Sequence, residues 1–270
     1  MPIRSIYFKE PVKPDQRHEK ILELLSEHRR ISVEDLNQAL DVSLETIRRD
    51  LGQLAERGLL RKIHGGAALV ETSGEGLFQS RLRLQAPAKR RIARKAASYF
   101  HPGDALFIDN GTTTLAFAEE LAGVDQVTII TNGTLIAAAI ARRARGSLEH
   151  QKRIFLLGGS FSGDGLETLG PFAHEQIQRF HAEHVVLTVG AVDVAHGVTD
   201  YDLGEASVAR AMIGQARTLT VLVDQSKFSR TALFEVCGLA AVDRLISDVL
   251  PEPDLLAALR ESEVEVVVAD

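Results

Sequence analysis

Three stretches near the start of the chain carry apolar residues at the three- and four-residue spacing of a helix that faces a core. They predict helices over residues 17–28, 33–40 and 44–57. Gly58 is expected to end the third helix, because glycine takes the left-handed conformation of a helix end at little cost. The apolar stripe of this third helix consists of Leu44, Ile47, Leu51 and Leu54.

The second and third helices are separated only by a short turn around Asp41 and Val42. Ser43 follows this turn, where its hydroxyl can cap the free N–H groups of the third helix. Two helices joined by a short turn, with basic residues on the outer face of the second, are typical of a helix-turn-helix whose second helix enters the major groove of DNA. The alternative interpretation is that Arg48 and Arg49 simply form a solvated helix face.

A pair of glycines, Gly65 and Gly66, divides two short apolar runs directly after this region. The pattern predicts a hairpin, or wing, with basic side chains that can contact DNA phosphates. Three consistent elements in one order favour DNA binding. The residues that we predict to contact DNA are Ser43, Glu45, Thr46, Arg48, Arg49, Arg61, Lys62, His64 and Gly65.

From Lys89 onward, short apolar runs alternate with amphipathic stretches. Strands alternating with helices of this length predict an α/β domain with a mainly parallel sheet that is covered on both faces. The predicted strands are 105–109, 127–131, 153–157, 184–189, 219–224, 244–247 and 264–268. The predicted helices are 90–100, 115–121, 134–145, 171–180, 203–216 and 254–262.

Polar residues and glycines gather at the carboxyl ends of these predicted strands, where ligands bind to open α/β sheets. The run Asp109 to Thr114 offers a glycine, hydroxyl groups and the N–H groups of a helix start, which together suit a phosphate. Without a ligand, the same run would be a capped turn. The residues that we predict to form the ligand site are Asp109, Asn110, Gly111, Thr112, Thr113, Thr131, Asn132, Gly158, Gly159, Gly190, Asp202, Glu205 and Lys227.

Lys227 and the acidic residues around Tyr201 extend this prediction to a sugar or polyol phosphate. A lysine can hold the phosphate, while carboxylates accept hydrogen bonds from hydroxyl groups. The alternative is structural: Lys227 would pair with Asp224, and the acidic residues would cap a helix.

Length and composition limit the number of domains and the class of protein. The 270 residues suffice for two domains, and 45% of them are apolar, as in ordinary packed cores. No apolar run has the length of a membrane span and no signal peptide is apparent, so we expect a cytoplasmic protein. The single cysteine, Cys237, excludes an internal disulfide and is expected to be buried filler.

The net charge of −6 is unusual for a DNA-binding protein. Residues 1–70 contain twelve Lys and Arg against eleven Asp and Glu, so the acidic excess belongs to the rest of the chain. A reader that is only weakly basic is expected to gain affinity as a homodimer or homotetramer. We predict a tail over residues 1–15, a winged helix-turn-helix over 16–72, a linker over 73–88, and a ligand-binding and oligomerisation domain over 89–270.

The motif from Val42 to Leu51, continued by Gly58, Arg61 and His64 to Ala67, resembles the amino-terminal signature of the DeoR family of bacterial transcription regulators. Further matching pieces lie in the second half, so the resemblance covers about residues 16–250. They are residues 108–113, 131–132, 157–159, 190–193, 197–199, 205, 224–228 and 246–248, with Ser247 where the family more often has threonine.

The resemblance implies a sensing domain similar in fold to ribose-5-phosphate isomerases and acyl-CoA transferases. It implies that Gly111, Thr112 and Thr113 hold a phosphate while Asp109, Glu205 and Lys227 face the sugar. Within the family, the pieces look most like the glycerol-3-phosphate repressors.

Two classes of function follow. The first is a repressor without a cofactor, which binds double-stranded operator DNA and is released by a phosphorylated sugar or polyol. The second is a sugar-phosphate isomerase-like enzyme with an accessory DNA-binding module, because Asp109, Glu205 and Lys227 can transfer protons. The sequence has no apparent carboxylate–base pair or metal-ligand cluster, and its DNA reader is intact, so we favour the first.

Overall fold

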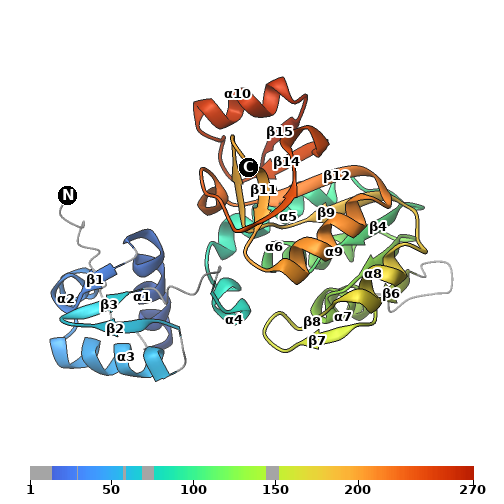
Figure 1. The fold of residues 1–270 in the computed structure, drawn as a ribbon. Coiled ribbons are helices and arrows are strands. Elements are labelled where there is room, and N and C mark those ends of the chain that lie inside the picture. Colours follow the sequence, from blue (N-terminus) through green and yellow to red (C-terminus); the bar gives the residue numbers. More distant parts are fainter. Residues whose placement is uncertain (1–13, 29, 57–58, 69–75, 144–151) are drawn as a thin grey trace. The chain divides into compact units, whose positions relative to one another are not determined.

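A computed structural model describes residues 14–28, 30–56, 59–68, 76–143 and 152–270 (Figure 1). Contacts divide the chain into two compact units, residues 1–84 and 85–270. No helix in the described ranges is both long and apolar enough to cross a membrane.

The described residues of the first unit form three helices with a three-stranded antiparallel sheet of order β1-β3-β2, followed by the short helix α4 (Phe78–Arg81). Its elements are α1 (Pro14–His28), β1 (Arg30–Ser32), α2 (Val33–Leu40), α3 (Leu44–Glu56), β2 (Arg61–Ile63) and β3 (Gly66–Ala68). Apolar side chains of all three helices form one core, which includes Ile21, Leu36 and Leu51. The helix-turn-helix and its wing are therefore present as predicted.

Two details of this unit differ from the prediction. Leu44 is 37% exposed, because the apolar stripe of α3 enters the core only from Ile47 onward. Strand β1 was not predicted, since its three residues follow α1 almost directly and pair with β3 far along the chain. The predicted helix end at Arg57 and Gly58 lies outside the described residues.

The second unit is built on a seven-stranded parallel sheet of order β15-β14-β12-β9-β4-β5-β6. The strands are β4 (Ala105–Ile108), β5 (Thr128–Thr131), β6 (Arg153–Leu156), β9 (Ala182–Leu187), β12 (Ala216–Val223), β14 (Arg244–Ser247) and β15 (Glu265–Val268). The helices are α5 (Ala86–Ala97), α6 (Thr112–Leu121), α7 (Thr134–Arg143), α8 (Pro171–Ile177), α9 (Leu203–Ile213) and α10 (Pro253–Glu261). Seven predicted strands correspond to these seven, which confirms the mainly parallel sheet.

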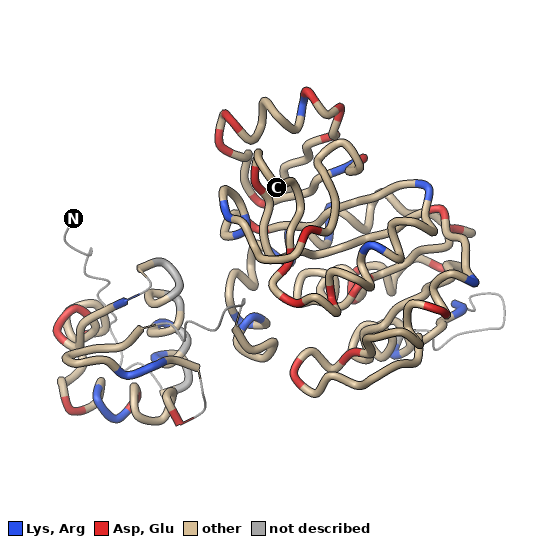
Figure 2. Tube along the Cα trace, in the orientation of Figure 1, with Lys and Arg blue, Asp and Glu red and all other residues tan. Residues whose placement is uncertain are grey.

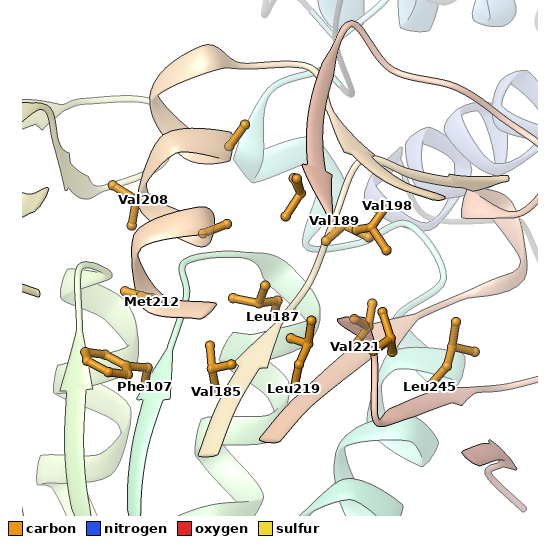
Figure 3. Packing of buried hydrophobic residues seen from close by; sticks show 14 of the residues in the cluster. Phe107, Val185, Leu187, Val189, Val198, Val208, Met212, Leu219, Val221 and Leu245 are labelled. Atoms are coloured by element: carbon orange, nitrogen blue, oxygen red, sulfur yellow. The ribbon is translucent and has the colours of Figure 1, made fainter. Parts of the chain in front are cut away.

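Except in the edge strand β6, alternate residues of each strand enter two separate cores, one on each face of the sheet. Phe107 and Val185 pack with α8, α9 and α10. Figure 3 shows both side chains on the same side of the sheet as Val208 and Met212 of α9. Leu106 and Val186 pack with α5, α6 and α7 on the opposite face. Each fully buried side chain of this size contributes about 1.5–3 kcal/mol, so both layers of helices are held firmly to the sheet.

Short antiparallel elements, which were not predicted, stand beside this sheet. One is the hairpin of β7 (Ser160–Ser162) and β8 (Glu167–Leu169). Another is a three-stranded sheet of β10 (Ala191–Asp193), β11 (Gly197–Asp200) and β13 (Phe234–Cys237). Short 3-10 turns, η2 (Gln225–Lys227) and η3 (Leu239–Ala241), complete the unit. Cys237 is partly buried in β13, and burial raises the pKa of its thiol to about 11.

Several boundaries differ from those expected. Helix α1 begins at Pro14, within the predicted tail, and residues 1–13 lie outside the described ranges. The described part of the predicted linker contains α4 (Phe78–Arg81) and the start of α5. Helix α5 starts four residues earlier than predicted because Pro87 occupies its first turn, a position that proline tolerates well.

Candidate DNA-binding surface and effector site

Helix α3 presents polar and basic side chains on the face opposite its buried stripe. The Ser43 hydroxyl accepts a hydrogen bond from the backbone N–H of Thr46 at 3.2 Å, so the predicted cap is present. Glu45, Arg48 and Arg49 are exposed. Figure 2 shows basic segments on both α3 and β2 of this unit. Two exposed guanidinium groups on a capped helix can reach phosphates or guanine edges.

Asp50, the next residue of α3, points the other way. Its buried carboxylate accepts hydrogen bonds from Arg17 on α1 through Nε and, at 3.0 Å, through Nη2. His18 Nε2 lies 3.1 Å from the same carboxylate. The hydrogen bond to Asp50 raises the pKa of Arg17. This buried ion pair joins α1 to the helix that carries Arg48 and Arg49, and sequence patterns alone did not identify it.

The wing places its three predicted phosphate contacts on the surface: Arg61, Lys62 and His64 are all exposed. Its two glycines serve different purposes. Gly65 has a φ of +73°, which the tight turn requires. Gly66 allows β3 to approach β1, since a Cβ there would lie 2.2 Å from the backbone oxygen of Ile31.

The order of strands in the large sheet defines where a ligand is expected. From β4 the chain moves outward through β5 to β6, and then returns to β9 on the other side of β4. In open α/β sheets, ligands bind beyond the carboxyl ends of the strands at such a reversal. Asp109 follows β4 and Thr188 follows β9, so both residues lie at this point.

The turn after β4 lies very close to the residues that follow β9. A Cβ on Gly111 would lie 2.0 Å from Cγ2 of Thr188, so only glycine fits there. Helix α6 begins at Thr112, three residues earlier than predicted, and Gly111 offers no side-chain cap to its first N–H groups. The buried Lys89 of α5 donates a hydrogen bond from Nζ to Oγ1 of Thr112 at 2.8 Å. A lysine beside an uncapped helix start is a suitable anion site.

Buried acidic and amide groups adjoin this candidate anion site. The backbone N–H of Asn110 donates to Oδ1 of Asp109 at 2.7 Å and to Oδ1 of Asn132 at 3.2 Å. The amide of Asn132 in turn donates to Oε2 of Glu167 at 3.0 Å. Burial first, and then the charges of Glu167 and Asp200, raise the pKa of Asp109 well above its usual range.

Three further predicted residues, Thr131, Gly190 and Thr113, also lie in this region. Thr131 is buried at the end of β5, and its hydroxyl accepts a hydrogen bond from the N–H of Gly133. The backbone N–H of Gly190 donates to Oδ2 of Asp200 at 3.2 Å. A Cβ on Gly190 would collide with the ring of Tyr201, which gives this glycine a packing role. Thr113 is fully buried in the first turn of α6.

The remaining predicted residues make contacts of their own. Gly158 and Gly159 contact Gln176 of α8 and the backbone of β8, respectively. Asp202 caps α9 by accepting hydrogen bonds from the N–H groups of Gly204 and Glu205. This is the helix-capping role that the structural alternative gave to the acidic residues around Tyr201. Asp224 caps η2 through Ser226. Burial and the nearby Arg230 lower the pKa of Lys227 to about 7.

Lys89 and Glu167 are the site residues that sequence reasoning missed. Lys89 had a usable signal: it falls on the apolar face of its helix with Ile92, Ala93 and Ala96, where a lysine is unusual. Glu167 had none, because it reaches the site on a three-residue strand that no periodic pattern predicts. The residues that the structure describes contain no group of three or more His, Cys, Asp or Glu that could hold a metal ion.

Comparison with known proteins agrees with both units. Residues 17–73 match the DeoR-like helix-turn-helix domain, and residues 84–249 match the DeoR C terminal sensor domain. The HTH-type transcriptional repressor CsqR of Escherichia coli K12 is 30% identical over 93% of this chain and 94% of that protein. The glycerol-3-phosphate regulon repressor of Haemophilus influenzae is 34% identical over 96% and 98%, respectively.

Among solved structures, ribose 5-phosphate isomerase A from Methanocaldococcus jannaschii has a TM-score of 0.39 and 14% identity. That likeness covers 53% of this chain and 55% of that one, and decides nothing about activity. The family matches extend over both units, and the two relatives align over nearly their whole length. The chain therefore belongs to the DeoR family of transcriptional regulators.

Proposed function

We propose that this protein represses a sugar or polyol catabolic operon and is released from double-stranded operator DNA by a phosphorylated sugar or polyol. Glycerol-3-phosphate is the first candidate, because a relative that is 34% identical is named for the glycerol-3-phosphate regulon. The protein would act in the cytoplasm as a homodimer or homotetramer, which presents two readers to one operator.

The hydrogen bond between Lys89 and Thr112 carries the sensing half of the proposal. Lys89 is buried, and its Nζ reaches the first residue of α6, where the positive end of the helix dipole also attracts anions. Both groups attract the same kind of ligand, a phosphate. Carboxylate and amide groups of Asp109, Asn110 and Asn132 adjoin it and can accept hydrogen bonds from hydroxyl groups.

DNA release requires that the phosphate bind more tightly to a conformation with low DNA affinity. A differential affinity of tenfold corresponds to about 1.4 kcal/mol, and coupling of 1–3 kcal/mol is typical of such proteins. The ligand-binding residues need not touch DNA. They need only favour one arrangement of the readers over another.

The isomerase-like alternative has a definite test. Asp109 and Lys227 have shifted pKa values, as catalytic groups often have, but buried binding groups have them as well. The intact DNA reader favours the regulator. Turnover of a sugar phosphate by the full chain at an enzymatic rate would favour the enzyme instead.

Thermal melting of the full chain tests the proposal directly. A ligand that binds only the folded state stabilises it by about 2.7 kcal/mol at one hundred times its Kd. We expect a concentration-dependent rise in Tm with one or more compounds from a panel of phosphorylated sugars and polyols that includes glycerol-3-phosphate. No rise with any of them would refute the sensing claim.

Two variants of the same helix sharpen this measurement. Lys89→Met removes the buried charge, and we expect it to abolish the ligand-induced rise in Tm. Lys95→Met removes an exposed charge two turns away and should leave the rise unchanged. If the ligand raised the Tm of both variants equally, Lys89 would not be part of the anion site.

A further inference from the structure

The segment that follows the wing differs in charge from the rest of the chain. Residues 76–103 contain seven Lys and Arg and no Asp or Glu, whereas residues 104–270 contain twelve Lys and Arg against twenty-four Asp and Glu. Helix α5 carries five of those seven basic residues and no acidic one. The reader, within residues 1–70, has a net charge of only +1. A strongly basic helix therefore follows a nearly neutral reader and belongs to an otherwise acidic unit.

Basic side chains of α5 gather on the face that points away from the core. Arg90, Arg94 and Lys95 are exposed, while Ile92 and Ala96 of the same helix are buried against the sheet. We call these three exposed residues the basic face. Among the described residues, none of the three forms an ion pair. The basic face is therefore open to an anionic partner.

Helix stability does not account for this arrangement. Arg90 and Arg94 are four positions apart, as are Arg91 and Lys95, and like charges at this spacing destabilise a helix by about 0.2–0.5 kcal/mol per pair. The helix dipole favours Arg94 and Lys95 in the last turn, but it does not favour Arg90 in the middle. A polyanion bound to the basic face would compensate this repulsion.

DNA is the polyanion that the reader brings close to α5. Residues 69–85 connect β3 of the wing to α5, and a chain of this length spans at most about 60 Å. Helix α5 is therefore held at a high effective concentration near any duplex that the reader occupies. A duplex carries one negative charge per about 1.7 Å of its axis, so it offers phosphates all along its length.

We propose that the basic face of α5 binds phosphates of the DNA that flanks the operator. The proposal rests on the DNA-binding half of the proposed function and needs no effector. Guanidinium and ammonium groups form charge-assisted hydrogen bonds with phosphate oxygens. Contacts to phosphates carry no sequence information, so the basic face adds affinity without adding specificity. It supplies the electrostatic attraction that a reader with a net charge of +1 lacks.

The salt dependence of binding counts these contacts in the full chain. Fluorescence anisotropy would compare two duplexes: the operator sequence that the full chain selects from a random library, and the same sequence extended on both sides by one turn of random DNA. Each phosphate contact adds about 0.9 to the slope of log K against log salt concentration. For the wild type, we expect the slope on the extended duplex to be steeper by about two to three per bound chain.

The triple variant Arg90→Gln, Arg94→Gln and Lys95→Gln removes the charge of the basic face. We expect the additional slope on the extended duplex to disappear. Between 50 and 200 mM salt, the affinity of the wild type for this duplex should then fall about ten- to fortyfold more than that of the variant. The preference for the operator over a scrambled sequence should not change, because the reader is intact.

A second triple variant, Arg179→Gln, Arg217→Gln and Arg260→Gln, is the matched control. It removes the same charge from exposed positions elsewhere in the second unit, and it should keep the slope of the wild type. Sedimentation velocity of both variants tests the other occupant whose charge would fit, an acidic surface of a second copy of the chain. A change of oligomeric state in the basic-face variant alone would assign this face to that contact and overturn the proposal.

The remaining outcomes separate this proposal from the function on which it rests. Equal slopes of the wild type on the two duplexes would overturn the proposal, even if the basic-face variant did not fold. Equal slopes of the two variants on the extended duplex would overturn it as well. Both results would leave operator binding standing. Failure of the full chain to select any duplex would overturn the repressor function and the basic face together.

Discussion

Asp109 is a buried carboxyl group that we expect to lower stability and to support effector binding. Burial and the neighbouring acidic groups raise its pKa in the folded protein, while in the unfolded chain it ionises at its ordinary value. Between these two values, unfolding releases a proton, so stability decreases as the pH rises. We expect Asp109→Asn to raise the Tm at pH 8, to change it little at pH 4, and to weaken effector binding at both.

Melting curves of the variant and the wild type at the two pH values check this prediction. Asp254→Asn, at an exposed position in the first turn of α10, is the matched control and should show no such gain. A loss of stability of the same size at both pH values would mean that Asp109 has a purely structural role.

Arg48 and Lys62 are expected to contribute to DNA binding in different ways. If Arg48 and Arg49 read bases, their replacement by alanine should each cost about 1–3 kcal/mol and relax specificity. Lys62→Ala should weaken binding to all sequences and reduce the salt slope by about one. Fluorescence anisotropy at several salt concentrations, on a duplex selected from a random library by the full chain, measures both effects.

Arg179→Ala is the control for these arginines, because Arg179 is exposed in the other unit, just after the end of α8. If both the Arg48 and Arg49 variants bound the duplex with unchanged affinity, α3 would not be the helix that enters the major groove.

At the scale of the element, the wing depends on one glycine. Gly66→Ala would place a methyl group against the backbone oxygen of Ile31, where neither strand can move away without breaking the sheet. We expect a cost of about 1–3 kcal/mol, together with faster amide hydrogen exchange across β1 and β3 and weaker DNA binding.

Gly52→Ala provides the opposite expectation within the same unit. Beyond the adjoining residues and the backbone of α3 itself, no atom lies within 4 Å of a Cβ there, and alanine is favoured over glycine inside a helix by about 1 kcal/mol. Slower amide hydrogen exchange in Gly52→Ala and faster exchange in Gly66→Ala would together confirm that β3 needs a glycine to approach β1. Equal exchange in the two variants would contradict it.

The elements that could be predicted are those whose apolar pattern is continuous and local. Helix α2 and strand β14 agree residue by residue with the prediction, because a complete stripe or a complete buried run marks each. The strands β7, β8 and β10 have only three residues, too few for a period, and β11 pairs with β13, far along the chain. Their pairing depends on contacts that no local pattern contains.

The same distinction applies to the candidate site. Asp109 to Thr113 form one contiguous run at a strand end, so their clustering was predictable from the sequence. Glu167 reaches Asn132 across 35 positions through an unpredicted hairpin. Lys89 reaches Thr112 from a preceding helix, and only its place on an apolar face indicates burial.

At the scale of the whole molecule, sensing and sequence-specific DNA binding are assigned to different units. Replacing Thr112 and Thr113 together by alanine should therefore leave operator affinity unchanged but reduce the response to the effector. Anisotropy titrations with and without the stabilising phosphate distinguish the two properties. A double variant that responds fully would contradict the phosphate site.

The central claim is that one phosphorylated metabolite controls the affinity for DNA. The most direct measurement is the Kd of the full chain for the selected duplex at increasing concentrations of the phosphate that raises its Tm most. We expect the Kd to rise at least fivefold and then to saturate, and we expect DNA to weaken the binding of the phosphate by the same factor. A Kd that stays constant while the phosphate saturates the protein would contradict the account.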